Sequence, residues 1–188
     1  MEVIFIKNMV CDRCKMVVKD QLENFSLQVG EVNLGEVEIL SGDLDAVKTP
    51  LKMELRSLGF ELLDEKDEVL NEQVKTALIN FINEEKIIKE QNISDYLSEK
   101  LSLDYHKLSK LFSRSNQVTI EKYFIKLKVE KAKQLIQEDK LNFSEISYAL
   151  GYSNLSHFSS QFKKEVGINL SEFKSRHVFN RKSLDKIL

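Results

Sequence analysis

An internal repeat in the second half of the chain limits what this sequence can fold into. Two segments match each other at an offset of 50 residues without gaps, so that Asn92–Asp95 pairs with Asn142–Glu145 and Leu108–Phe112 with Phe158–Phe162. The later matched positions are Val118-Thr119-Ile120 with Ile168-Asn169-Leu170, and Tyr123 with Phe173. Self-similarity at a fixed spacing indicates that one supersecondary unit occurs twice.

The pattern within each copy predicts a helix, a short turn and a second helix. In the second copy, Ser144 is the expected cap of the first helix, Gly151 provides the break, and Ser153 or Asn154 caps the second helix. In the first copy, Ser94 is the expected cap. This is the helix-turn-helix plan, in which the second helix enters the major groove of DNA.

The two copies are separated by a stretch that predicts one long helix. Residues 119–137 carry apolar side chains at helical spacing, at Ile120, Phe124, Leu127 and Leu135. At 1.5 Å per residue this helix would span roughly 28 Å, which is near the ~34 Å between successive major grooves on one face of B-DNA. A single chain could therefore bind two adjacent grooves, and the pattern is compatible with a monomer or a homodimer.

The second copy resembles the DNA-binding domain of AraC/XylS-type transcription regulators. The resemblance rests on the run Gly151–Lys164 together with Gly167, Ser171 and Phe173, and it covers about residues 72–176. It implies an all-α double helix-turn-helix domain that binds double-stranded DNA. RNA polymerase is a further candidate partner of such a domain.

The resemblance also implies which side chains face the DNA. In the first copy the base-facing positions are His106, Ser109 and Lys110. In the second copy they are Ser156, His157, Ser159 and Ser160, and Asn154 is a further candidate DNA contact. Phosphate contacts, which position a protein without specifying sequence, suit Lys107, Lys122, Lys163 and Lys164. The family often has Arg, the strongest reader of guanine, where Lys110 and Ser160 stand, and Pro where Leu170 stands, so we expect modest affinity or an unusual target sequence.

Both cysteines of the chain lie in one short loop, Asn8–Cys14, within a front part that has a mixed pattern. The predicted order is strand, helix, two strands with a turn at Gly35, helix and strand, which is the ferredoxin-like arrangement. Pro50 predicts a kink in the second helix or a later start for it, and Gly59 ends that helix. We therefore expect an α+β chain, with an N-terminal ferredoxin-like βαββαβ domain followed by the all-α double helix-turn-helix domain.

This front part resembles the heavy-metal-associated domains of copper chaperones and metal-pumping ATPases. The resemblance rests on the predicted element order and on the loop that spans residues 9–14, and it covers about the first third of the chain. It implies that Cys11 and Cys14 bind a soft metal ion. It also implies that Met9 is a buried anchor and that Phe60 packs beside the site.

The chemistry of the two thiols favours Cu(I) as the cofactor. Soft thiolates select Cu(I) and zinc over harder ions, and zinc normally needs four ligands, or three plus water. The histidines His106, His157 and His177 all lie in the back part of the chain, so two-coordinate Cu(I) fits best. Zn(II), with its site completed across a dimer, and other thiophilic ions stay open. Because Cys14 lies near a helix N-terminus and beside Arg13, we expect a lowered thiol pKa there.

Other uses of the front part also stay open. The two thiols could form a reversible disulfide and act as a redox switch. They could have no function in a domain that serves for dimerisation or packing, because Asn8 and Val10 replace the Gly and Thr of the family's commonest loop. The chain could also carry metal, with the back part only tethering it. No nucleophile–base pair, phosphate loop or acid pair stands out, so we do not expect an enzyme.

The charge distribution supports a division into two domains. Residues 1–68 hold 8 Lys and Arg against 15 Asp and Glu, a net −7, whereas the remaining residues hold 20 against 15, a net +5. The basic part is the better partner for a polyanion. We place the heavy-metal-associated domain at 1–66, the DNA-binding domain at 70–178 and a tail at 179–188. No signal peptide and no membrane-spanning run is visible, so we expect a cytoplasmic, metal-responsive transcription regulator that binds no membrane.

Overall fold

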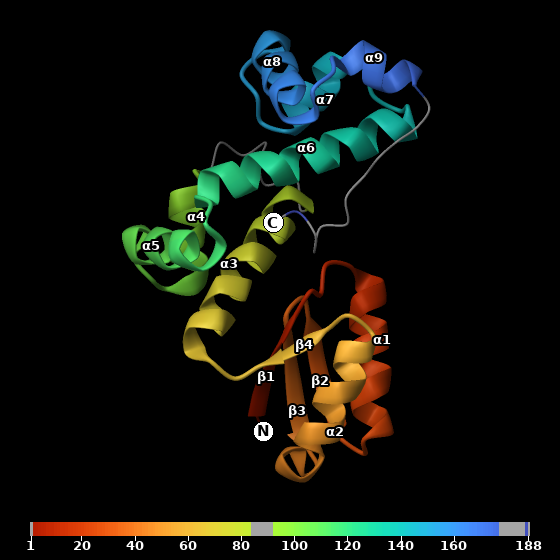
Figure 1. Ribbon diagram of the computed structural model, residues 1–188, viewed down its shortest axis with the longest axis vertical. Coiled ribbons are helices and arrows are strands. Elements are labelled where there is room, and N and C mark those ends of the chain that lie inside the picture. Colours follow the sequence, from red (N-terminus) through yellow and green to blue (C-terminus); the bar gives the residue numbers. More distant parts are fainter. Residues whose placement is uncertain (1, 84–91, 177–186, 188) are drawn as a thin grey trace. The chain divides into compact units, whose positions relative to one another are not determined.

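The chain folds as two compact units joined by one continuous helix. A computed structural model describes residues 2–83, 92–176 and 187. The units are Met1–Thr76 and Ala77–Leu188. Helix α3, Lys66–Asn83, begins in the first unit and ends in the second (Figure 1). The charged run Asp64–Glu68, which contains no Gly or Pro, is therefore partly helical, because α3 begins at its third residue.

Among the described residues, no helix is both long and apolar enough to cross a membrane. The third histidine, His177, lies outside them, as does the predicted tail 179–188 apart from Ile187.

The first unit is a four-stranded antiparallel sheet with two helices, in the chain order that the sequence predicts. The strands lie in the order β2-β3-β1-β4, with β1 and β3 at the centre, where Ile4 pairs with Val37. Helices α1 and α2 pack against each other beside this sheet (Figure 1). The element bounds are β1 Glu2–Lys7, α1 Asp12–Asn24, β2 Gln28–Asn33, β3 Glu36–Ser41, α2 Leu44–Ser57 and β4 Glu61–Leu63.

Alternation along the central strands defines the core of the first unit. On β1, Ile4 and Ile6 are buried, whereas Val3 is exposed. The reason is that successive side chains of a strand point to opposite faces of the sheet. The helices complete the core from one side, with Val18 and Leu22 from α1 and Leu51 and Leu55 from α2. One layer of helices on one face of the sheet leaves the loop between β1 and α1 at the sheet's end.

Pro50 lies inside helix α2 and does not delay its start. The helix begins at Leu44, with the Asp43 carboxylate accepting a hydrogen bond from the Ala46 N–H at 3.0 Å, and Pro50 lies inside it. A later helix start is therefore wrong. The helix ends at Ser57, and Gly59 follows with a φ of +88°, as the sequence predicts.

The second unit repeats a helix pair on either side of one long helix. Helices α4 and α5 form the first pair, α7 and α8 the second, and the 19-residue α6 runs between them as predicted (Figure 1). In each turn a residue takes the left-handed conformation, Ser102 with φ 52° and Gly151 with φ 68°. The bounds are α4 Ile93–Leu101, α5 Tyr105–Asn116, α6 Ile120–Glu138, α7 Phe143–Ala149, α8 Leu155–Val166 and α9 Leu170–Ser175.

The helix caps correct two predictions. The caps are Asn92 and Asn142, each two residues before the predicted serine. Asn142 makes a reciprocal capping box, in which its side chain accepts the Glu145 N–H at 3.0 Å and its own N–H donates to the Glu145 carboxylate at 2.7 Å. Ser94 and Ser144 lie inside the helices, since an Asn followed by an acid three residues later outcompetes a lone serine.

Candidate metal site and DNA-binding surface

The thiol loop, which we define as residues 8–14, joins β1 to α1. Cys11 is the N-cap of α1 with extended backbone, and Cys14 lies in the first turn. Met9 between strand and helix is 1% exposed and belongs to the core, which agrees with its expected role as a buried anchor. The two sulfur atoms lie 3.4 Å apart, with Cys11 exposed and Cys14 partly buried. One ion could therefore touch both thiols from the solvent side.

Phe60 lies in the same core as the loop's anchor. It is buried at the end of the turn after α2, and its N–H donates to the Leu55 carbonyl at 2.8 Å. Cys14 packs against that core as well. The apolar surroundings hold the helix start under the thiols in place.

The two thiols differ in acidity, and the difference corrects one expectation. Burial raises the pKa of Cys11, but hydrogen bonds from the Cys14 backbone, the Cys14 thiol and the Arg13 backbone outweigh it, so the pKa of Cys11 is lowered. Burial raises the pKa of Cys14, and the hydrogen bond with Cys11 adds to the rise. The direction expected for Cys14 is therefore wrong, because burial and the neighbouring thiol outweigh the backbone hydrogen bonds that lower its pKa.

The donor set of the loop suits a thiophilic ion of low coordination number. Among the described residues, no group of three or more His, Cys, Asp or Glu side chains is placed to hold a metal ion. Two thiolates alone fit Cu(I) better than zinc, which needs further ligands.

The first helix-turn-helix pair exposes the side chains that the sequence assigns to DNA. On α5, Leu108 and Phe112 are buried and turn the opposite face outward. Asp104 fixes the helix start, since its carboxylate accepts the N–H of His106 at 2.9 Å. The candidate DNA contacts His106, Lys107 and Lys110 are exposed, and Ser109 is partly buried. Their role in binding stays a prediction.

The second pair has the same layout with different chemistry. On α8, Phe158 and Phe162 are buried, and the Asn154 side chain accepts the His157 N–H at 2.8 Å, so Asn154 and not Ser153 is the cap. The exposed candidates are Asn154, Ser156, His157, Ser160, Lys163 and Lys164, while Ser159 is partly buried; Lys122 on α6 is exposed too. This helix offers hydroxyl groups where α5 offers a lysine.

A stack beneath α8 was not predicted from the sequence. Tyr152, in the turn before α8, is buried, and its ring lies 5.4 Å from the His157 ring in an edge-to-face arrangement. Lys128 on α6 places its Nζ 3.9 Å from the centre of the Tyr152 ring. Burial lowers the pKa of Lys128 to about 8. Tyr152 thus packs against the ring of His157, a candidate DNA contact, and its place just after Gly151 was the signal in the sequence.

Comparison with known protein families finds a match for this region. Residues 97–176 match the helix-turn-helix domain family. The matched range begins inside α4 and ends just after α9. The match agrees with the resemblance to AraC/XylS-type regulators that the sequence predicts for residues 72–176.

Two curated relatives match part of the chain. The Msm operon regulatory protein of Streptococcus mutans is 31% identical over 78 residues, which are 42% of this chain and 28% of that protein. The HTH-type transcriptional activator RhaS of Escherichia coli is 30% identical over 71 residues, 38% of this chain and 26% of that protein. The chain thus spans less than a third of the length of either relative. Both carry names of regulators and not of enzymes, in agreement with the expectation that this chain is not an enzyme.

Two solved structures also match part of the chain. The C-terminal domain of the two-component response regulator yesN from Fusobacterium nucleatum is 28% identical, with a TM-score of 0.47, and the match covers 54% of this chain and 98% of that one. An AraC-type DNA-binding domain-containing regulator from Chromobacterium violaceum is 23% identical, with a TM-score of 0.49, and the match covers 57% and 95%.

Proposed function

We propose that the chain is a metal-responsive, sequence-specific DNA-binding transcription regulator. In this proposal the second unit is an AraC/XylS-type DNA-binding domain, and the first is a ferredoxin-like, heavy-metal-associated domain that holds a thiophilic ion. The observation that carries it is the joining of two helix-turn-helix pairs to a loop with two sulfur atoms 3.4 Å apart.

The DNA part of the proposal is supported by the exposed faces of α5 and α8. Each helix is anchored by two buried apolar side chains and presents short polar or basic groups outward. Such groups can donate hydrogen bonds to base edges in the major groove. The lysines near them, Lys107, Lys122, Lys163 and Lys164, would neutralise phosphates, so the affinity should fall steeply as salt rises.

The metal part is supported by the donor set of the thiol loop. Cys11 and Cys14 would hold the ion, Cu(I) by preference, with Zn(II) or another thiophilic ion as alternatives. A bound ion would supply a fixed positive charge shared by the two thiolates. Cys11, with the lower pKa, would lose its proton first, and Met9 would keep the loop seated in the core.

A binding titration tests the proposal directly. A duplex is first selected from a random-sequence library by the whole chain, and its affinity is then measured with and without one equivalent of Cu(I) in reducing, oxygen-free buffer. By linkage, metal and DNA must change each other's affinity by the same factor. Equal DNA affinities, with the metal demonstrably bound, would overturn metal responsiveness. Failure to select any duplex would favour a metal-carrying protein.

A redox switch is a second candidate, favoured by the close approach of the two sulfur atoms. Loss of two protons and two electrons to an added oxidant, such as a disulfide reagent, would join Cys11 to Cys14. DNA affinity that responds to the oxidant and not to Cu(I) would support this candidate. The double variant Cys11→Ser, Cys14→Ser should then respond to neither.

A further inference from the structure

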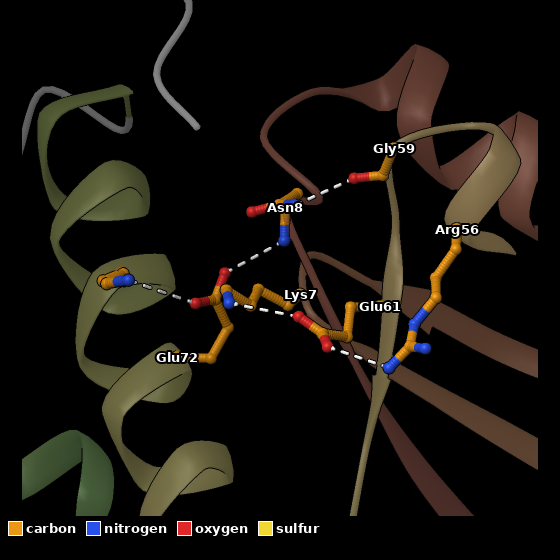
Figure 2. A network of polar contacts seen from close by, with 7 residues as sticks. Lys7, Asn8, Arg56, Gly59, Glu61 and Glu72 are labelled. Atoms are coloured by element: carbon orange, nitrogen blue, oxygen red, sulfur yellow. Dashed lines mark hydrogen bonds and ion pairs between the residues drawn. The ribbon is translucent and has the colours of Figure 1, made fainter. Parts of the chain in front are cut away.

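A buried carboxylate on α3 contacts the residue at the start of the thiol loop. Glu72 is 8% exposed, and its Oε1 accepts a hydrogen bond from the Asn8 backbone N–H at 3.1 Å (Figure 2). Its second oxygen lies 3.7 Å from Nζ of Lys75, one turn later on the same helix. Burying a charge is costly unless the charge is paired and hydrogen-bonded. An apolar residue at this position would avoid the desolvation cost of the charge, so the buried carboxylate points to a function.

Asn8 links the loop to two helices at once. Its φ of 72° lies in the left-handed region, which Asn tolerates better than most residues but not as well as Gly. Its side-chain Nδ2 donates to the Gly59 carbonyl, just after α2, at 2.8 Å (Figure 2). The Asn8 side chain therefore adds a bond to the residue after α2 that a glycine could not make, whereas the bond to α3 uses the backbone N–H.

Helix α3 also comes close to the sheet at Thr76. A Cβ added to Gly35, in the turn between β2 and β3, would lie 3.0 Å from Oγ1 of Thr76. The Gly35 carbonyl in turn accepts the Ile6 N–H at 3.0 Å, just ahead of the loop. Thr76 of α3 thus lies near the turn whose backbone bonds to the strand that leads into the thiol loop.

The same helix continues into the core of the second unit. Leu78 and Phe81 are buried there, and the Phe81 ring lies 4.6 Å from that of Tyr96 and 5.8 Å from that of Phe124. Tyr96 belongs to α4 of the first helix-turn-helix pair, and Phe124 belongs to α6. A shift of α3 against the first unit would therefore be felt by the elements that carry α5.

We propose that Glu72 transmits the metal state of the thiol loop to the DNA-binding unit. The hydrogen bond from Asn8 to Glu72 has a different strength in the metal-free and the metal-bound loop, because the thiols that would hold the ion follow Asn8 within six residues and a bound ion would change their 3.4 Å spacing. The bond biases the position of α3, and α3 carries that bias into the second unit. The inference rests on the proposed function and names the positioning residue for it.

The test compares variants that keep or lose the acceptor. Glu72→Met removes it at similar volume, Glu72→Gln keeps an amide oxygen in its place, and Glu68→Met is the matched control on the exposed surface of α3 one turn earlier. The quantity measured is the ratio of DNA affinities with and without Cu(I), on the duplex selected by the unaltered chain. A ratio of about 5 to 150 is typical of allosteric coupling.

The outcomes separate the inference from the proposed function. We expect Glu72→Met to bring the ratio to within about twofold of one, while Glu72→Gln and Glu68→Met keep most of the unaltered chain's ratio. A purely structural role would lower the melting temperature and leave the ratio unchanged, which would overturn the inference. A ratio of one in the unaltered chain would overturn the proposed function itself. Should Glu72→Met fail to fold, the double variant Glu72→Met, Lys75→Met removes the unpaired lysine and gives the same readout.

Discussion

The proposed metal ligands of the first unit lie close together in one loop, whereas the proposed DNA contacts of the second unit are spread over separate helices. In the first unit both thiols belong to one loop, three positions apart, with sulfur atoms 3.4 Å from each other. In the second unit the proposed contacts lie on α5 and α8, with the 19 residues of α6 between the two helix pairs. A two-ligand site fails when either ligand is lost, whereas a surface of many contacts weakens in steps. This difference sets the size of each effect expected below.

The largest effect should come from either cysteine. Cys11→Ser and Cys14→Ser should each lower Cu(I) affinity by more than about 100-fold, because even groups outside the coordination shell cost 10–100-fold. A competition titration against a coloured Cu(I) chelator measures this. A loss at one cysteine only would mean that the pair is not the site.

A smaller effect, on the affinity for DNA, should come from the residues proposed to face the bases. Lys110→Ala should weaken binding to the selected duplex by about 1–3 kcal/mol, as expected for a good base contact. Ser160→Ala, at the matching position of α8, should cost less because a hydroxyl donates more weakly than an ammonium. Fluorescence anisotropy at fixed salt gives both values, with Lys19→Ala on α1 as the control. A larger loss at Ser160 would reverse the ranking of the two helices.

The contact between Lys128 and Tyr152 should make the free energy of unfolding depend on pH. Between the lowered pKa of Lys128, about 8, and its ordinary 10.5, the unfolded chain holds more protons than the folded one. The free energy of unfolding should therefore rise with pH across this window by about 1–3 kcal/mol. Lys128→Met should lose that rise in urea titrations at pH 8 and pH 10, whereas Lys122→Met, exposed on the same helix, should keep it. An unchanged rise in Lys128→Met would show that Lys128 is not the cause.

The smallest effect should come from a single phosphate contact. Lys163→Ala should reduce the slope of log affinity against log salt by about 0.9, equally on the selected duplex and on unrelated DNA. Lys19→Ala should leave the slope unchanged. A loss confined to the selected duplex would make Lys163 a base reader.

Much of the fold follows from patterns that are local along the chain. The offset repeat, the long α6 and the strand–helix order of the first unit all rest on apolar spacing, which the structure shares. Caps were misplaced by two residues, because Asn142 and Glu145 form a reciprocal pair that outcompetes Ser144. The residues that face solvent on α5 and α8 follow from the four-residue spacing of the buried apolar side chains, which are Leu108 and Phe112 on α5 and Phe158 and Phe162 on α8.

What the sequence could not predict depends on distant contacts. Asn8 and Glu72 are 64 positions apart, and nothing in the sequence near either residue indicates their hydrogen bond. Lys128 and Tyr152 likewise come together only in the folded chain, where Lys128 of α6 lies over the ring of Tyr152 in the turn between α7 and α8. The pKa of Cys14 is raised where the sequence predicted a lowered value, because burial and the hydrogen bond with Cys11 depend on the folded loop.

The central claim is that metal on the thiol loop changes DNA binding. The most direct measurement is the affinity of the whole chain for its selected duplex, with and without one bound Cu(I), beside the double variant Cys11→Ser, Cys14→Ser. The account predicts a change of at least about fivefold in the unaltered chain and none in the variant. Equal affinities in the unaltered chain, with one Cu(I) shown to be bound per chain, would contradict it.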